Sequence, residues 1–376
     1  MALYTQNHLI QGKRMLARHR RVRGKNFTRL GDDATFICQQ ILKKTWTGVF
    51  YKTSLGHYPV FYARDFAMVV DALLELGYRD RVIKTLRYAL TQYRRAAAIT
   101  SFISSNNKPI QFPNVYSPDS VAYMLRSVAI VDDAQLTSRF KHFLQEQVNI
   151  FASQVVHPVT GEVKRHIHLQ GMRDHSKRDS SCYDAVMCGV VSWAANKLGL
   201  KNPLIDIDYS DLIQQTYWTG THFKDDQSSS SNPSHITADA NIYPFWLRVC
   251  SDTNKLRTAI CTMQFYKLDK PFPIRYVASS DYKGKTIFAE CFVPNWEANA
   301  VWPMSGLPFI DIVSRVDKTR AKEYLLQYKK IIEQYGTLVE VFTQNAKPYK
   351  SWWYSADEGM IWAANYLVLA KRLLHS

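Results

Sequence analysis

One carboxylate near the end of the chain, Glu340, lies in a short apolar run (LVEVF) that leads into a Pro-containing loop. Three consecutive aromatic residues follow, Trp352, Trp353 and Tyr354, and then a segment that is apolar on nearly every helical face. Aromatic rings can cover the C–H faces of a sugar, while carboxylates bind hydroxyl groups or transfer protons. This stretch therefore predicts part of a carbohydrate site.

Further carboxylates lie at the predicted starts of apolar helices, beside aromatic residues. Capping and the helix dipole favour acidic residues at helix N-termini, which explains some of these carboxylates, Asp119 and Asp357 first. Trp296, in a Pro-Asn-Trp turn, and the 352–354 triplet are predicted to be surface platforms for sugar rings. The other residues in this pattern are Tyr62, Asp65, Tyr116, Asp179, Tyr183, Asp184, Asp239, Tyr243, Trp246, Glu297, Trp302 and Glu358.

Hydrophobic periodicity indicates helices almost throughout, with little strand alternation. The expected helices span 31–46, 65–77, 79–96, 118–131, 134–156, 183–198, 207–217, 239–251, 253–266, 296–313, 318–335 and 357–374. Segments such as 79–96 carry one apolar stripe and one charged face, whereas 183–198 and the last helix are apolar almost all round. Outer helices with one wet face thus alternate with inner helices that are covered on both sides.

The lengths of the connections predict how these helices are arranged. Links from an inner to the next outer helix are short, but six links from outer to inner helices are long, spanning 47–64, 97–117, 157–182, 218–238, 267–295 and 336–356. Loops of that length in a compact domain are usually functional. The pattern predicts an all-α fold, an (α/α)6 barrel of six helical hairpins with its site at the loop-bearing mouth. An α-solenoid would instead show a regular repeat and short loops on both sides.

Composition limits the other possibilities. The chain has 376 residues, 46% of them hydrophobic, and a formal charge of +16 that is spread mainly over outer helical faces. We therefore expect a solvated basic surface and no nucleic-acid partner. No apolar run is long enough to span a membrane, no signal peptide is evident, and the six scattered cysteines form no CxxC pair, so a reduced, cytoplasmic monomer is expected. The expected organisation is a basic N-terminal extension over 1–30 and one catalytic domain over 31–376.

Several segments resemble, in the same order, those of glucoamylases and related six-hairpin glycosidases, a group that includes trehalases and processing α-glucosidases. FYARDFAMVVDALLELG (61–77) is similar to the Arg-Asp segment entering an inner helix, and DSSCYDAVMCGVVSWAANKLG (179–199) to the helix that begins with the general acid. ADANIYPFW (238–246) and PNWEANAVWPM (294–304) resemble later inner-helix starts. The segment at 338–370 resembles the closing one, in which a catalytic base precedes the last inner helix.

The resemblance implies roles for individual residues. Glu340 matches the general base that activates water, Asp184 the general acid, and Arg64 with Asp65 the pair that holds hydroxyls of the sugar being cleaved. Glucoamylases usually carry Glu at the position of Asp184, so Asp179 or Asp239 remains an alternative acid, and Glu358 an alternative base.

The sequence thus predicts an inverting glycoside hydrolase that cleaves α-glucosidic or related bonds in an oligo- or polysaccharide, without metal or cofactor. The expected substrate-binding residues are Tyr62, Arg64, Asp65, Asp179, Asp239, Trp296, Trp352, Trp353 and Tyr354. His166, His168 and His175 are expected to form ordinary hydrogen bonds, because no Cys or carboxylate set completes a metal site. Two alternatives stay open: a polysaccharide lyase or unsaturated-uronyl hydrolase on the same barrel, and a non-catalytic carbohydrate-binding protein.

Overall fold

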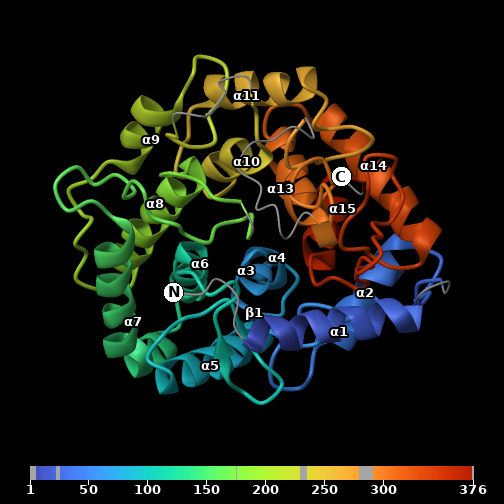
Figure 1. Ribbon diagram of the computed structural model, residues 1–376, viewed down its shortest axis with the longest axis horizontal. Helices are drawn as coiled ribbons and strands as arrows, with labels where there is room; N and C mark the ends of the chain where they lie inside the picture. Colours follow the sequence, from blue (N-terminus) through green and yellow to red (C-terminus); the bar gives the residue numbers. More distant parts are fainter. Residues whose placement is uncertain (1–5, 23–25, 175, 229–234, 279–290, 375–376) are drawn as a thin grey trace.

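The structure is a computed structural model, which describes residues 6–22, 26–174, 176–228, 235–278 and 291–374. Its helices form two concentric rings (Figure 1). The outer ring consists of α2 (Ala34–Thr45), α5 (Arg79–Arg95), α7 (Ala134–Val155), α9 (Tyr209–Tyr217), α11 (Thr253–Phe265) and α14 (Lys318–Tyr335). The inner ring consists of α3 (Ala63–Ala67) with α4 (Val70–Glu75), α6 (Pro118–Val131), α8 (Cys182–Lys197), α10 (Ala238–Trp246), α13 (Pro303–Ser314) and α15 (Ala363–Leu373). The predicted (α/α)6 barrel is confirmed.

The ring closes because each inner helix contacts the next, and α15 contacts both α13 and α4. Outer helices bury one stripe, as in α5, where Val82, Leu86, Ala89, Leu90 and Tyr93 face inward. In α6, by contrast, nearly every residue is buried. The two hydrophobic patterns in the sequence therefore correspond to the two rings.

Helix capping differs between the two ends of the barrel. Five of the six outer helices begin at an Asp whose side chain accepts a backbone N–H, namely Asp33, Asp133, Asp208, Asp252 and Asp317. Among the inner helices that the structure describes, only α8 has such a cap, and it is Ser181. The acidic residues at the inner-helix starts are therefore not acting as N-caps, which leaves their carboxylates available for other contacts.

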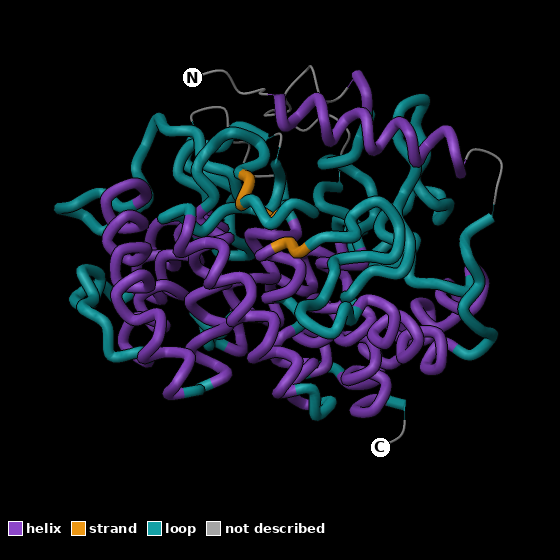
Figure 2. The backbone as a smooth tube through the Cα atoms, turned by 90° about the horizontal axis from the view of Figure 1, so that it is seen from below, coloured by secondary structure: helices purple, strands orange, loops and turns teal. Residues whose placement is uncertain are grey.

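The long connections gather on one side of the barrel, here called the loop face (Figure 2). A small antiparallel sheet lies among them, in the order β1 (Phe61–Tyr62), β2 (Phe102–Ile103) and β3 (Pro109–Ile110). Phe61 pairs with Ile103, and Phe102 with Ile110. This sheet fixes the chain where it enters α3.

Four expected helices have different bounds. The helix expected over 65–77 is split into α3 and α4, and the one expected over 239–251 ends at Trp246, before Arg248 with a positive φ of 59°. The helix expected over 296–313 begins only at Pro303, a residue suited to the first turn. The last helix begins at residue 363 and not at 357, because the backbone of 357–359 bonds instead to Leu338 and Glu340, and Gly359 adopts a φ of 67°.

The N-terminal extension contains a helix that was not expected, α1 (Gln6–Val22). It lies across the loop face, outside both rings (Figures 1 and 2). Its partly buried Met15 packs against the hydrophobic core. In the described parts of the chain, no helix combines the length and apolar character that crossing a bilayer requires.

Candidate active site

Glu340 is held by the backbone of the chain's closing segment. Its N–H donates to the carbonyl of Asp357 (3.0 Å), and the Asp357 N–H donates back to Glu340 Oε2 (2.8 Å). The Tyr354 hydroxyl donates to the same carboxylate oxygen at 2.6 Å. The glutamate and the aromatic triplet that follows it are therefore one structural unit, with only 3% of Glu340 exposed.

The surroundings of Glu340 favour its protonated form. Burial, and after it the charge of Asp357, raises the pKa of Glu340 from 4.5 to about 8, although the bonds from Tyr354 and from the Asp357 N–H act in the opposite direction. Burial also lowers the pKa of His57 to about 4, so its ring is neutral at pH 7. His57 Nε2 and the Tyr58 hydroxyl lie 2.7 and 3.1 Å from the Tyr354 oxygen. A chain of neutral hydrogen-bonding groups thus leads to Glu340.

Tyr62, Arg64 and Asp65 lie where β1 meets α3. The Tyr62 ring stacks on Phe102 with centroids 4.8 Å apart. Asp65 accepts a bond from Trp362 Nε1 (3.0 Å), and burial raises its pKa from 3.8 to about 6. The positions are compatible with the sugar-binding roles predicted for all three residues, which stay predictions.

Arg64 binds a carboxylate that the sequence did not single out, Asp174. The guanidinium donates to Asp119 Oδ2 (2.7 Å), to the carbonyl of Gly171 (2.7 Å) and to Asp174 Oδ1 (3.1 Å). The Asp174 side chain keeps 31% of its surface exposed. Asp174 lies in a polar loop, GMRDHSK, that has no periodicity and whose histidines alone suggested a site. The one available signal was an acid beside a predicted inner-helix start.

Tyr62 is linked to Glu340 through aromatic residues: its ring lies 5.5 Å from that of Tyr58, whose hydroxyl contacts the Tyr354 hydroxyl that donates to Glu340. Burial, and then the charges of Asp65, Asp174 and Glu340, raises the pKa of the Tyr62 phenol. Glu340 and Asp65 also interact with each other. The structure thus brings Glu340, Asp65 and Asp174 together with the half-buried Tyr62, and we call these four residues the carboxylate cluster.

Asp184 lies beside Gly171, the residue whose carbonyl Arg64 binds, and a Cβ on Gly171 would lie 3.3 Å from Asp184 Oδ1. Asp184 is 3% exposed, accepts a bond from Ser181 Oγ (2.6 Å), and its pKa is raised by burial to about 6. The charges that act on it come from Arg178, Asp119 and Asp239. Its Oδ1 is buried without a hydrogen-bond partner among the described residues. Asp184 therefore lies beside the loop that carries Asp174 and is as deeply buried as Glu340.

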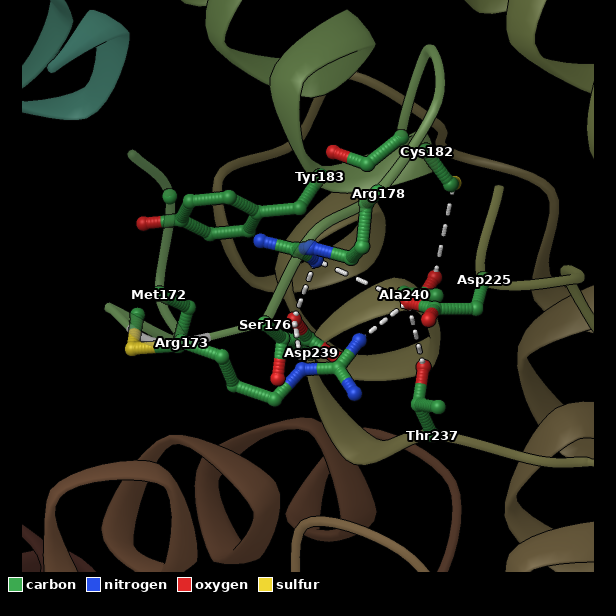
Figure 3. A network of polar contacts seen from close by, with 12 residues as sticks. Met172, Arg173, Ser176, Arg178, Cys182, Tyr183, Asp225, Thr237, Asp239 and Ala240 are labelled. Atoms are coloured by element: carbon green, nitrogen blue, oxygen red, sulfur yellow. Dashed lines mark hydrogen bonds and ion pairs between the residues drawn. The ribbon is translucent and has the colours of Figure 1, made fainter. Parts of the chain in front are cut away.

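Asp239 forms part of the buried ionic network beneath that loop (Figure 3). Arg178 Nη1 donates to Asp239 Oδ2 at 2.8 Å, and Arg173 bonds to Asp225. Arg173 and Arg178 flank the loop that carries Asp174, so the network fixes that loop against α10. Asp179 lies elsewhere in the loop, where Arg165 (2.9 Å) and the His166 N–H (2.6 Å) donate to its carboxylate. Both aspartates thus have structural partners, and their predicted sugar-binding roles stay predictions.

We expect Arg178→Met to lower the free energy of unfolding by about 3–5 kcal/mol, because it leaves buried carboxylate charge uncompensated. Arg320→Met is the matched control, since Arg320 pairs with Glu323 on the surface of α14, and we expect a change of only about 0–1 kcal/mol. Urea denaturation of both variants measures the difference. Equal small losses would show that the network adds nothing to stability.

The predicted aromatic platforms differ in exposure. Trp352 is 62% exposed, whereas Tyr354 is buried against Glu340. Trp353 faces α1, with its ring 3.7 Å from where a Cβ on Gly12 would lie. Trp296 is half-buried and packs at 4.6 Å from the rings of both Tyr354 and Trp302. Trp352 is therefore the member of this set best placed to meet a ligand from solvent.

Asp357 is not the helix cap that was predicted, since the last helix begins at Ala363, whereas the role of Glu358 as an alternative base stays a prediction. Asp357 is fully buried and accepts bonds from Ser54 Oγ (2.5 Å) and from the N–H groups of His57 (3.0 Å) and Tyr58 (3.2 Å). Glu358 accepts bonds from Arg18 (2.9 Å) and from the Thr28 N–H (2.7 Å). Both oxygens of Glu358 are thus held by the N-terminal segment.

Metal ligation has no support in the described part of the chain, where no group of three or more His, Cys, Asp or Glu side chains is arranged to hold an ion. The His166 side chain is 84% exposed, and His168 is half-buried. His175 lies outside the described residues.

Comparisons with known proteins identify the fold. No protein-family model matches the chain, and no curated protein matches its sequence. A solved structure described as a wild-type glycosidase is similar, with a TM-score of 0.62 and 12% identity over 90% of this chain and 96% of that one. The GH63 mannosylglycerate hydrolase from Thermus thermophilus, in complex with Tris and D-glycerate, has a TM-score of 0.61 and 11% identity, over 90% of this chain and 100% of that one. A rhamnosidase from Klebsiella oxytoca with rhamnose bound has a TM-score of 0.60 and 10% identity, over 92% of this chain and 66% of that one. At these identities the likeness establishes a six-hairpin fold of the kind found in glycosidases.

Proposed function

We propose that this protein is a glycoside hydrolase that acts on an oligosaccharide or a related glycoside at the loop face. The carboxylate cluster carries the proposal, because contacts between aromatic rings connect Glu340 to Tyr62, and Arg64, two residues further on, binds Asp174. Trp296, which packs on Tyr354, extends this wall of aromatic rings. Glycoside hydrolysis needs two carboxyl groups, one protonated and one ionised. The similar structures are described as glycosidases, which supports this interpretation without fixing the sugar. An α-glucosidic bond, as in glucoamylases, is the substrate that the sequence resemblance favours.

We assign the general base to Glu340, as the resemblance predicts. The general acid is Asp184 by that resemblance. Burial raises the pKa of Asp184 to about 6, which favours the protonated form that an acid needs, and Asp184 is no more buried than Glu340. Asp174 is the alternative acid, because its side chain is 31% exposed to solvent, but Arg64 holds it as a carboxylate. Arg64 and Asp65 then bind hydroxyls of the sugar. An inverting mechanism requires carboxyl groups about 6.5–9.5 Å apart, with the water between them.

The raised pKa of Glu340 predicts how kcat/KM depends on pH. A general base must be ionised, so kcat/KM should rise with pH until Glu340 has lost its proton, near pH 8. If Glu340 were the acid, kcat/KM would instead fall through the same range. Initial rates between pH 5 and about 10 distinguish the two roles. In any residual activity of Glu340→Gln, the rise of kcat/KM with pH should be absent.

The proposed function is tested by a screen of α- and β-linked disaccharides and aryl glycosides of glucose, mannose and rhamnose, with released reducing sugar as the readout. We expect hydrolysis of at least one glycoside by the wild type and its loss in Glu340→Gln. Binding of sugars without turnover would favour a carbohydrate-binding protein. The absence of both would contradict the proposal.

The lyase or unsaturated-uronyl hydrolase alternative requires cations that are free to bind an anionic sugar. Arg64 and Arg178, which lie beside the carboxylate cluster and the loop that supports it, are each bound to a carboxylate. This pairing favours a neutral sugar, whereas Arg14 of α1, whose charge acts on Tyr62 and which donates to Ser105, is the cation that an anionic sugar would have to use.

A further inference from the structure

The N-terminal helix α1 reaches the rear of the carboxylate cluster through one side chain. Arg18 Nη2 donates to Glu358 Oε1 (2.9 Å), and its Nε lies 3.6 Å from Asp357 Oδ1. The Arg18 side chain is only 13% exposed, and Asp357 is completely buried. Both carboxylates follow Glu340 in the closing segment, and Asp357 bonds to Glu340 twice through its backbone.

The fit is specific to this arginine. A Cβ on Gly56 would lie 1.5 Å from Asp357 Oδ1 and 2.9 Å from Arg18 Cζ, so only glycine leaves room for the contact. Next to Arg18, the buried His19 places Nδ1 3.0 Å from Ser355 Oγ. These contacts join α1 to the segment that also carries Tyr354 and Glu340.

Two positive charges act on neighbours of Glu340, Arg64 on Asp65 and Arg14 on Tyr62. The closing segment contributes Asp357, Glu358 and the neutral Tyr354, while α3 contributes Asp65. The loop before β1 contributes Tyr58 and His57, whose ring is neutral at pH 7. Within the described ranges, Arg18 is the basic residue other than His57 that forms an ion pair with Asp357 or Glu358.

We propose that α1 is part of the active site, and that Arg18 is a positioning residue that neutralises the Asp357–Glu358 pair and thereby keeps Glu340 able to ionise. The inference rests on the proposed function for its consequence in catalysis. Without Arg18, two adjacent carboxylates would oppose a third negative charge at Glu340. With it, Glu340 releases its proton at a pH where the enzyme can work.

The test uses charge changes of opposite sign in the full-length protein. Arg18→Met should move the ascending limb of the kcat/KM profile to higher pH by about half a unit or more, because negative charge accumulates beside Glu340. Arg18→Lys should restore most of the shift, and Glu358→Gln alone should move the limb to lower pH. The double variant Arg18→Met/Glu358→Gln should lie near the wild type. Arg21→Met, which removes an exposed charge from the same helix, is the control.

A second readout needs no activity. The pKa of Glu340 is higher in the folded protein than its ordinary value, so Glu340 destabilises the fold progressively as pH rises from 4.5 to about 8. The difference in melting temperature between a protein with Glu340 and its Glu340→Gln counterpart should therefore grow over this range and then level off. In the Arg18→Met background it should level off at higher pH, and in Glu358→Gln at lower pH.

A failure of the proposed function can be told apart from a failure of the inference about Arg18. If no glycoside is hydrolysed but the thermal series shifts as expected, the proposed function is wrong while the coupling between α1 and Glu340 stands. If Arg18→Met behaves as Arg21→Met in both readouts, or Glu358→Gln produces no downward shift, the inference is overturned. Since Glu358→Gln retains the shape of the side chain, it tests the idea even if Arg18→Met fails to fold.

Discussion

Glu340→Gln is expected to lower kcat for glycoside hydrolysis by about 10²- to 10⁴-fold, the usual contribution of a general base. Gln cannot accept the proton of the attacking water, but it keeps the size of the side chain and an oxygen that can accept the bonds from Tyr354 and the Asp357 N–H. The loss should therefore fall on kcat, with KM little changed. Steady-state kinetics on the best substrate from the glycoside screen measure both constants.

The control is Glu323→Gln, which removes an exposed carboxylate from α14. It should leave both constants at wild-type values. Because burial disfavours the ionised form of Glu340, Glu340→Gln should also be at least as stable as the wild type above pH 8, so the lost activity cannot be ascribed to unfolding. Wild-type turnover by a folded Glu340→Gln would remove Glu340 from the mechanism.

Asp184→Asn is expected to lower kcat on glycosides with a sugar leaving group by about 10²- to 10⁴-fold, because the departing oxygen would no longer be protonated. The loss should shrink greatly with an aryl leaving group of low pKa, which departs without a proton. This dependence on the leaving group is diagnostic of the acid, since loss of a binding residue would affect both substrates alike.

Asp174→Asn is the matched variant, because Asp174 is the more exposed candidate for the same role. We expect its main effect on KM, through the lost ion pair with Arg64, which is proposed to bind the sugar. If Asp174→Asn shows the leaving-group dependence and Asp184→Asn does not, Asp174 is the acid and the assignment by resemblance fails.

The fold was predictable because its signals are repeated and local. Inner and outer hydrophobic patterns alternate around the whole barrel, and each long loop precedes an inner helix. The predicted helix ends were wrong where the backbone forms hydrogen bonds to a neighbouring segment. Asp357, for example, occupies the place of an N-terminal cap, yet its N–H and carbonyl bond to Glu340, and the helix begins at residue 363.

The candidate site was predictable only where an acid stands out from its surroundings. Glu340 interrupts an apolar run, so its burial could be foreseen. Asp174 is one polar residue among many in its loop, and only the contact with Arg64, which comes from a different hairpin, distinguishes it. The contact of Arg18 with Glu358 spans 340 positions of the chain. No local pattern in a basic N-terminal segment encodes such a partner.

The most direct test of a base-activated water is the configuration of the first sugar released. Hydrolysis of the best substrate should be followed by ¹H NMR within the first minutes, before the product mutarotates. If Glu340 activates water on the face opposite the leaving group, an α-linked substrate gives the β-anomer first. Initial appearance of the α-anomer would show a retaining mechanism and contradict the assignment of Glu340 as the base.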